Sequence, residues 1–163
     1  MDFAEDRLIN ERRFMALLVK DEATAFGLAL RVAPSFKAVD LENVLDELVA
    51  KHGSPAFIRS DNGGQFISFT IQRWAQRRNI TLAYIQPGKP WQNGLAECFV
   101  GTYRTEVLNA EVFHSISESD VVSRSLLRCT TTSVHTVSTT IFHQRLLSQH
   151  VQHDHYFLDI ELV

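Results

Sequence analysis

The stretch "FIRSDNGGQF", residues 57–66, ends a short apolar run on Asp61, directly before Asn62, Gly63 and Gly64. Asn-Gly and Gly-Gly are strong turn signals, so a simple turn is one interpretation. A carboxylate at the end of a strand, with small residues beside it, also leaves room for a cation and a substrate phosphate to approach. Taken alone, the ten residues favour the turn, and the rest of the chain has to decide.

The sequence on both sides of this stretch predicts an α/β domain. The predicted strands share alternating or continuous apolar residues, and they cover 2–6, 14–19, 26–32, 56–60 and 80–85. The predicted helices share apolar residues at helical spacing, and they cover 41–52, 66–78 and 94–110. Asp40 is expected to cap the first helix. This order predicts a mixed five-stranded sheet, with its first three strands antiparallel, flanked by helices.

Length and composition predict one soluble domain. The chain has 163 residues, of which 45% are hydrophobic and 21% charged, enough for a single core. It has two cysteines, Cys98 and Cys129, and no CxxC pair, which favours a reducing compartment over a disulfide framework or structural zinc. The charged N-terminus and the lack of a long apolar run indicate a cytoplasmic protein with no membrane partner. The net charge of −3 weighs mildly against nucleic-acid binding.

Three acidic residues could meet at one edge of the predicted sheet. Asp2 lies in the first strand, Asp61 ends the fourth, and Glu97 lies in the first turn of the last helix with 35 residues between it and Asp61. Alone, Asp2 is a terminal acid and Glu97 is an acid favoured by the helix dipole. Together they would repel each other unless a divalent cation neutralised them. Two Mg²⁺ or Mn²⁺ ions held in this way can support phosphoryl transfer.

The motifs "SDNGGQF", "GKPWQNGLAE" and "RTEVLN", in this order, resemble the catalytic core of the DDE transposases of insertion sequences, the orfB type, which is the group closest to retroviral integrases. The resemblance covers residues 2–113. It implies an RNase H-like fold, Mg²⁺ or Mn²⁺ as cofactor, and cutting and joining of element DNA at its 3′ ends. It further implies that Asp2, Asp61 and Glu97 are the catalytic and metal-binding acids, and that intact relatives act as homo-multimers on transposon ends and target DNA.

The resemblance also implies supporting roles for neighbouring residues. Asn62, Gly63 and Gly64 would shape the metal edge. Four residues of the loop and helix beyond the last strand would bind DNA: Lys89, Gln92, Asn93 and Arg104. For each of them, an ordinary turn residue or a solvated side chain is about as common an explanation. Both tryptophans, Trp74 and Trp91, are expected to be packing residues rather than residues that stack on DNA.

Both ends of the chain depart from the family pattern. The family usually carries a helix-turn-helix region and a longer first strand before the position of Asp2, so a truncation is expected there. After about Glu118 the sequence is crowded with Thr, Ser and His. Codons for 128–137 read one base earlier permit Leu-Tyr-Asn-Asn-Glu-Arg-Pro-His-Ser, the segment that the family has at this place. The sequence therefore predicts a catalytic core over 1–117 and an out-of-frame tail over 118–163, with a frameshift between about Glu118 and Arg128.

Three functions stay open at this point. The first is an active integrase-type catalytic core that cleaves and transfers DNA strands. The second is an inactive transposase remnant that keeps the fold and binds nucleic acid weakly at most. The third, less favoured, is an RNase H-like nuclease that hydrolyses nucleic acid without joining it.

Overall fold

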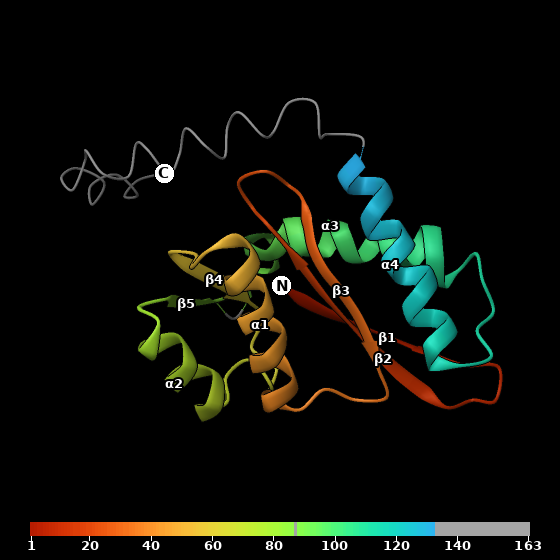
Figure 1. The fold of residues 1–163 in the computed structure, drawn as a ribbon, viewed down its shortest axis with the longest axis horizontal. Coiled ribbons are helices and arrows are strands. Elements are labelled where there is room, and N and C mark those ends of the chain that lie inside the picture. The colour runs from red at the N-terminus through yellow and green to blue at the C-terminus, as the bar shows by residue number, and fades with distance from the viewer. Residues whose placement is uncertain (87, 133–163) are drawn as a thin grey trace.

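The computed structural model describes residues 1–86 and 88–132. The described strands are β1 (Asp2–Arg7), β2 (Arg13–Lys20), β3 (Gly27–Ala33), β4 (Phe57–Ser60) and β5 (Thr81–Tyr84). The helices are α1 (Ala38–His52), α2 (Phe69–Arg77), the 3-10 helix η1 (Pro90–Asn93), α3 (Gly94–Tyr103), the π-helical turn η2 (Arg104–Leu108) and α4 (Ile116–Thr132). The predicted order of strands and helices is confirmed through α3, and it is followed by α4, which the sequence did not predict (Figure 1).

The five strands form two hydrogen-bonded ladders. Strands β1, β2 and β3 are antiparallel, as predicted, with Asp2 opposite Leu18 and Leu18 opposite Leu30. Strands β4 and β5 are parallel, with Ser60 opposite Tyr84. A continuous five-stranded sheet was expected, but the ladders are separate. The amino group of Met1, directly before β1, donates to the carbonyl oxygen of Arg59 in β4 at 2.7 Å, so the two ladders meet at this point.

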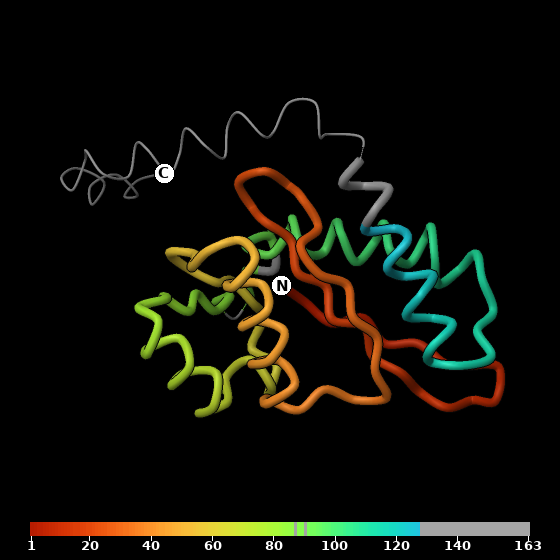
Figure 2. Tube along the Cα trace, viewed as in Figure 1, coloured from red at the N-terminus to blue at the C-terminus, as the bar shows by residue number. Residues whose placement is uncertain are grey.

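Strand β2 is buried on both faces, which explains its continuous apolar run. Leu17 and Val19 pack into a hydrophobic cluster with α1 and α2, whereas Ala16 and Leu18 pack into a second cluster with α3 and α4. Successive side chains of a strand point to opposite faces, so alternation along β2 supplies both clusters. In Figure 1, α1 and α2 lie to the left of the three-stranded sheet and α4 lies to its right. The trace in Figure 2 shows the N-terminus in the middle of the molecule.

Three helix boundaries differ from the predicted ones, each because of local hydrogen bonding. Lys37, not Asp40, is the N-cap of α1; Asp40 is the third helical residue, and its carboxylate accepts from the Lys37 amide at 2.8 Å. Helix α2 begins three residues later than predicted, after the cap Ser68. Helix α3 ends at Tyr103, where the π-helical turn η2 widens the backbone before Asn109. Such single π-helical turns have no clear sequence signature.

Helix α4 packs on the core across the predicted domain boundary. The hydroxyls of Tyr103 and Ser123 are 2.9 Å apart and buried, and Leu126 joins the second hydrophobic cluster. The amide of Val32 on β3 donates to Asp120 of α4 at 3.2 Å. A boundary after residue 117 therefore falls inside a helix that belongs to the core through Leu126. Residues 133–163, most of the predicted out-of-frame tail, lie outside the described residues.

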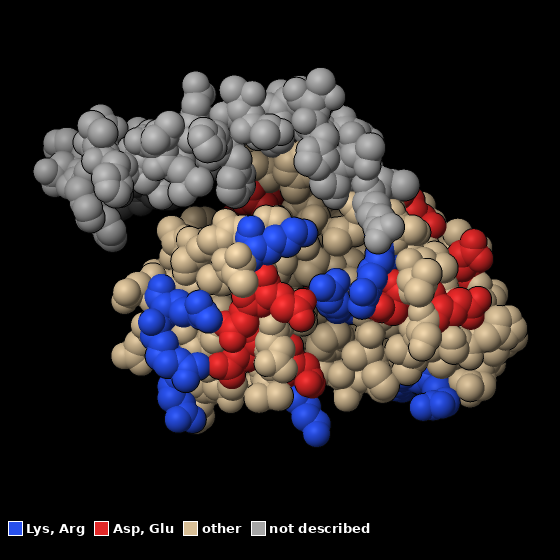
Figure 3. All heavy atoms as spheres, in the orientation of Figure 1, with Lys and Arg blue, Asp and Glu red and all other residues tan. Residues whose placement is uncertain are grey.

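Two properties of the described residues bear on partners. No helix among them is long and apolar enough to cross a membrane. On the face in Figure 3, basic side chains are interspersed with acidic ones rather than gathered into one continuous basic area. Ion pairs join basic and acidic side chains among the described residues, including Arg31–Glu47, Arg77–Glu42 and Arg78–Asp46.

Candidate active site

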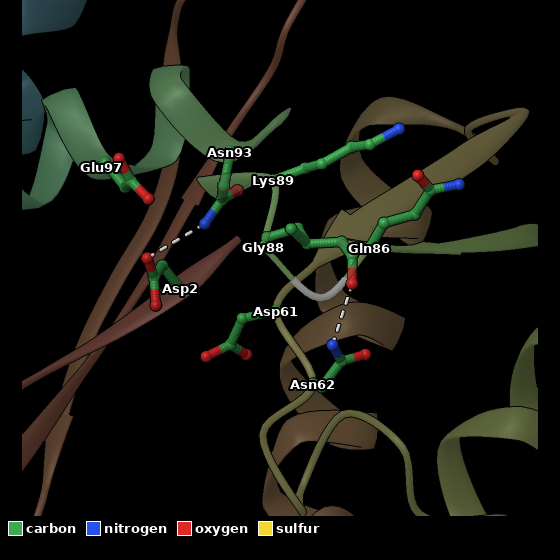
Figure 4. Close-up of a pocket in the computed structure, with 9 residues that line it drawn as sticks. Asp2, Asp61, Asn62, Gln86, Gly88, Lys89, Asn93 and Glu97 are labelled. Atoms are coloured by element: carbon green, nitrogen blue, oxygen red, sulfur yellow. Dashed lines mark hydrogen bonds between the residues drawn. The ribbon is translucent and has the colours of Figure 1, made fainter. Parts of the chain in front are cut away.

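A pocket of about 300 Å³ lies where the start of β1 meets the ends of β4 and β5. Its lining residues come from β1, the turn after β4, the segment after β5, η1 and α3: Asp2, Asp61, Asn62, Ile85, Gln86, Gly88, Lys89, Asn93 and Glu97. The three predicted acids are thus brought to one pocket from distant parts of the sequence. In the view of Figure 4, Asp2 lies between Glu97 and Asp61.

Asp2 has a defined hydrogen-bonding environment. Its Oδ1 accepts from the amide of Phe3 at 2.7 Å, and its Oδ2 accepts from Nδ2 of Asn93 at 3.1 Å. Burial raises the pKa of Asp2, and the charges of Asp61 and Glu97 act in the same direction. The Phe3 amide and the terminal ammonium oppose this rise. The carboxylate is therefore held in place in surroundings where a cation would stabilise its charge.

Asp61 combines the two interpretations of the sequence motif. Its Oδ1 accepts from the amide of Gly63 at 3.1 Å, which closes a tight turn directly after β4. A Cβ atom on Gly63 would lie 3.1 Å from that same oxygen and 3.3 Å from Phe66, so a glycine allows the close approach. Gly64 has open space around it. The turn positions the carboxylate, so turn and site are the same feature.

Glu97 is exposed in the first turn of α3, and its carboxylate is accessible from the pocket. Carboxylate oxygens are the ligands that Mg²⁺ and Mn²⁺ prefer, so the three acids fit such an ion by chemical type. Within residues 1–86 and 88–132, however, no three Asp, Glu, His or Cys side chains are placed so that they could hold one ion together. The three acids therefore line one pocket but are not all placed around a single ion position.

The other predicted site residues divide into two groups: Asn62, Lys89 and Asn93 line the pocket, whereas Gly63, Gly64, Gln92 and Arg104 do not. Asn62 and Lys89 line the pocket; the Asn62 amide donates to the Ile85 carbonyl at 2.9 Å, and Lys89 extends away from the acids in Figure 4. Gln92 and Arg104 do not line it. The Gln92 Oε1 accepts from the Gln86 amide at 3.0 Å, whereas Arg104 is exposed at the start of η2.

Some contacts at the site could not be seen in the sequence. Arg59 of β4 donates to the carbonyl oxygen of Gln92 at 3.2 Å and pairs with Glu22 at 3.4 Å, so it connects β4, η1 and the β2–β3 turn. The sequence has no signal for these contacts because they join distant segments. Trp74 is 1% exposed, as expected of a packing residue, but the same prediction is wrong for Trp91, which is 69% exposed because η1 carries it on the surface.

Comparison with known proteins identifies the family. Two models described as "Integrase core domain" match residues 1–90 and 78–126. The chain therefore belongs to the integrase core domain family. Its core is that of a DDE transposase or integrase, a class of proteins of DNA integration and recombination. The second match extends through most of α4, which agrees with the packing of that helix.

Insertion elements encode two similar proteins. An uncharacterized 39.2 kDa protein of insertion element IS476 from Xanthomonas euvesicatoria is 35% identical over 124 residues, which are 76% of this chain and 36% of that protein. An uncharacterized 31.7 kDa protein of insertion element IS407 from Burkholderia multivorans is 34% identical over 122 residues, 75% of this chain and 44% of that protein. The chain thus spans less than half the length of each relative.

Solved structures share the fold. An intasome of simian T-cell lymphotropic virus in complex with PP2A regulatory subunit B56 gamma matches with a TM-score of 0.57 and 19% identity, covering 75% of this chain and 44% of that chain. The catalytic core of BIV integrase matches with a TM-score of 0.51 and 16% identity, covering 66% and 68% of the two chains. The HTLV-2 integrase core in complex with magnesium, in trimeric form, also has a TM-score of 0.51 at 16% identity and covers 67% of this chain and 69% of that one. These likenesses confirm the RNase H-like fold.

Proposed function

We propose that this chain is the catalytic core of an insertion-sequence transposase that cuts and joins DNA 3′ ends. Asp2, Asp61 and Glu97 are its catalytic and metal-binding acids, and Mg²⁺ or Mn²⁺ is its cofactor. The observation that carries the proposal is that these acids line one pocket although they come from β1, the turn after β4, and α3. Side chains of one chemical type that distant segments bring into one pocket are the usual sign of a functional site.

The residues around the acids have roles that follow from their positions. When bound, the divalent ions would activate the attacking oxygen and stabilise the leaving oxygen of phosphoryl transfer. Gly63 lets the turn close on the Asp61 carboxylate, and the neighbouring Gly64 has open space around it. Lys89, at the end of the pocket away from the acids, is suited to contact a DNA phosphate.

DNA is the proposed partner, and a multimer of this core in the cytoplasm is the proposed acting form, because joining two element ends to a target requires more than one site. The chain itself has a net charge of −3, and basic and acidic side chains are interspersed on the face in Figure 3. Affinity for long DNA rises with the number of phosphates that a protein neutralises. We therefore expect most of the DNA affinity to come from other parts of a full-length transposase.

A strand-transfer assay tests the proposal. The purified chain is incubated with Mn²⁺ and a labelled duplex that carries the terminal repeats of the encoding element, and joined products are separated on a gel. We expect joined product from the wild type and its loss in Asp61→Asn and Glu97→Gln. Glu111→Gln is the matched control, because Glu111 is also exposed and lies outside the pocket. Absence of joined product with the wild type would contradict the proposal.

A second candidate is an inactive remnant of such a transposase. In the same assay a remnant gives no joined and no cleaved product, whereas a nuclease of this fold gives cleaved product alone. The three functions therefore predict three different gel patterns.

We further propose that the chain after about Arg128 is read in a shifted frame. The packing of α4 through Leu126 supports a shift near the end of the window between Glu118 and Arg128. The proposal is tested by sequencing the encoding DNA. It is wrong if no single-base shift in that window restores the segment Leu-Tyr-Asn-Asn-Glu-Arg-Pro-His-Ser.

A further inference from the structure

Asn93 is a buried polar residue at an otherwise exposed place. Its residue exposure is 4%, whereas its neighbours Trp91 and Gly94 are exposed. Its side chain makes no hydrogen bond to the helix that it precedes. Its Nδ2 atom instead donates to Oδ2 of Asp2, 91 positions earlier in the chain. The burial of Asn93 is therefore tied to a specific contact with one acid of the pocket.

The usual role of asparagine at this position is not the one that Asn93 has. Asn93 is the N-cap residue of α3, and asparagine is among the preferred N-cap residues because its side chain can accept from the first helical amides. Here the side chain makes no capping hydrogen bond. A capping bond typically contributes about 1 kcal/mol to helix stability. The side chain is turned away from the helix and toward Asp2, as Figure 4 shows.

The backbone of the loop holds Asn93 in this orientation. The preceding residue, Gln92, is fixed twice: its carbonyl oxygen accepts from Arg59, and its side chain accepts from the Gln86 amide. The following residue, Gly94, begins α3. Asn93 is thus anchored from both sides, and the same helix carries Glu97 one turn later. A side-chain hydrogen bond therefore connects the start of α3 to Asp2.

From this geometry we infer that Asn93 is a positioning residue, which orients the Asp2 carboxylate for a divalent cation. The Phe3 amide and Asn93 each use one lone pair of a different Asp2 oxygen, so both oxygens keep a lone pair for an ion. An amide is a neutral donor and fixes the carboxylate without adding a positive charge that would repel the cation. A lysine or arginine at this place would compete with the ion. The inference rests on the proposed function, in which Asp2 binds a metal.

Mn²⁺ binding by the whole chain, measured by isothermal titration calorimetry, tests the inference. Asn93→Leu has a similar side-chain size but no donor. Loss of a partner that orients a metal ligand commonly weakens metal binding by about 10-fold to 100-fold, and we expect at least the lower value here. Asn43→Leu is the matched control, because Asn43 is exposed on α1 and outside the pocket, and its affinity should equal that of the wild type. Wild-type affinity in folded Asn93→Leu would overturn the inference.

A second measurement does not depend on a metal. In NMR spectra of the metal-free chain, the side-chain amide protons of Asn93 should exchange slowly with water and should lose this protection in Asp2→Ala. The side-chain amide of Asn62 is the internal reference, because it donates to the Ile85 carbonyl and not to an acid. Equal exchange of Asn93 with and without Asp2 would overturn the inference. If the wild type binds no Mn²⁺, the proposed function fails, and the exchange of Asn93 still decides whether it orients Asp2.

Discussion

Helix α4 should be energetically coupled to α3 through the buried hydroxyl pair of Tyr103 and Ser123. Both residues are 0% exposed, and their hydroxyls are 2.9 Å apart. Tyr103→Phe removes one hydroxyl and leaves the other buried without this partner. A lost hydrogen bond of this kind costs about 1 kcal/mol, and a buried hydroxyl left unpaired raises the cost to about 1–3 kcal/mol. We expect Tyr103→Phe and Ser123→Ala each to lower the free energy of unfolding by about 1–2 kcal/mol.

A double-mutant cycle in urea, followed by circular dichroism, measures the coupling. The double variant should lose about as much stability as either single variant, which gives a coupling energy of about 1–2 kcal/mol. Ser125→Ala is the control: Ser125 is exposed, its hydroxyl bonds the Val122 carbonyl within α4, and its replacement should change stability by less than about 0.5 kcal/mol. Additive effects, or single variants as mild as the control, would refute the docking of α4 on the core.

Two further predictions concern the pocket. At pH 7 and without divalent ions, Asp2→Asn should unfold at a higher temperature than the wild type. Burial raises the pKa of Asp2 above its ordinary value of 3.8, so the charged carboxylate destabilises the folded chain. With a raised folded pKa, the wild type is most stable while Asp2 is protonated, and it loses stability as pH rises through that pKa. The difference in melting temperature between Asp2→Asn and the wild type should therefore vanish below pH 3.8. A difference that stays constant across a pH series of thermal melts would contradict this prediction. Gly63→Ala should weaken Mn²⁺ binding in calorimetry, because its Cβ would crowd the Asp61 carboxylate at 3.1 Å, whereas Gly64→Ala should bind as the wild type does. Equal affinities of the two alanine variants would refute this role of Gly63.

The fold was largely predictable because its elements have strong local signals. Alternation in β3, the continuous apolar run of β2 and the helical spacing in α1 each follow from burial on one or two faces. What local patterns could not show is how the strands join. The expectation of one sheet was wrong because β1 and β4 do not form a ladder with each other, and pairing between strands so far apart in the sequence leaves no local pattern.

The site was predictable as a set of acids but not as a geometry. Asp61 could be found because a strand end beside glycines is unusual, and Glu97 because of its spacing from Asp61. Asn93 was expected to bind DNA, and the structure adds a contact that the sequence does not indicate, because its largely buried side chain donates to Asp2 in the pocket. An asparagine before a helix has the same local sequence whether it caps the helix or reaches across the fold. Only the tertiary structure separates the two roles.

The division of the strands into two ladders has a mechanical consequence for the pocket. Asp2 belongs to the three-stranded ladder and Asp61 follows the two-stranded one, and where the ladders meet the amino group of Met1 donates to the carbonyl oxygen of Arg59 at 2.7 Å. The spacing of these two carboxylates therefore depends on how the two ladders pack against each other, which includes the stacking of Phe3 on Phe66 at 4.8 Å between ring centroids. A substitution far from the pocket that tilts one ladder against the other would change metal affinity without altering any ligand. Conversely, an ion bound by both acids would hold the two ladders in a fixed relative position.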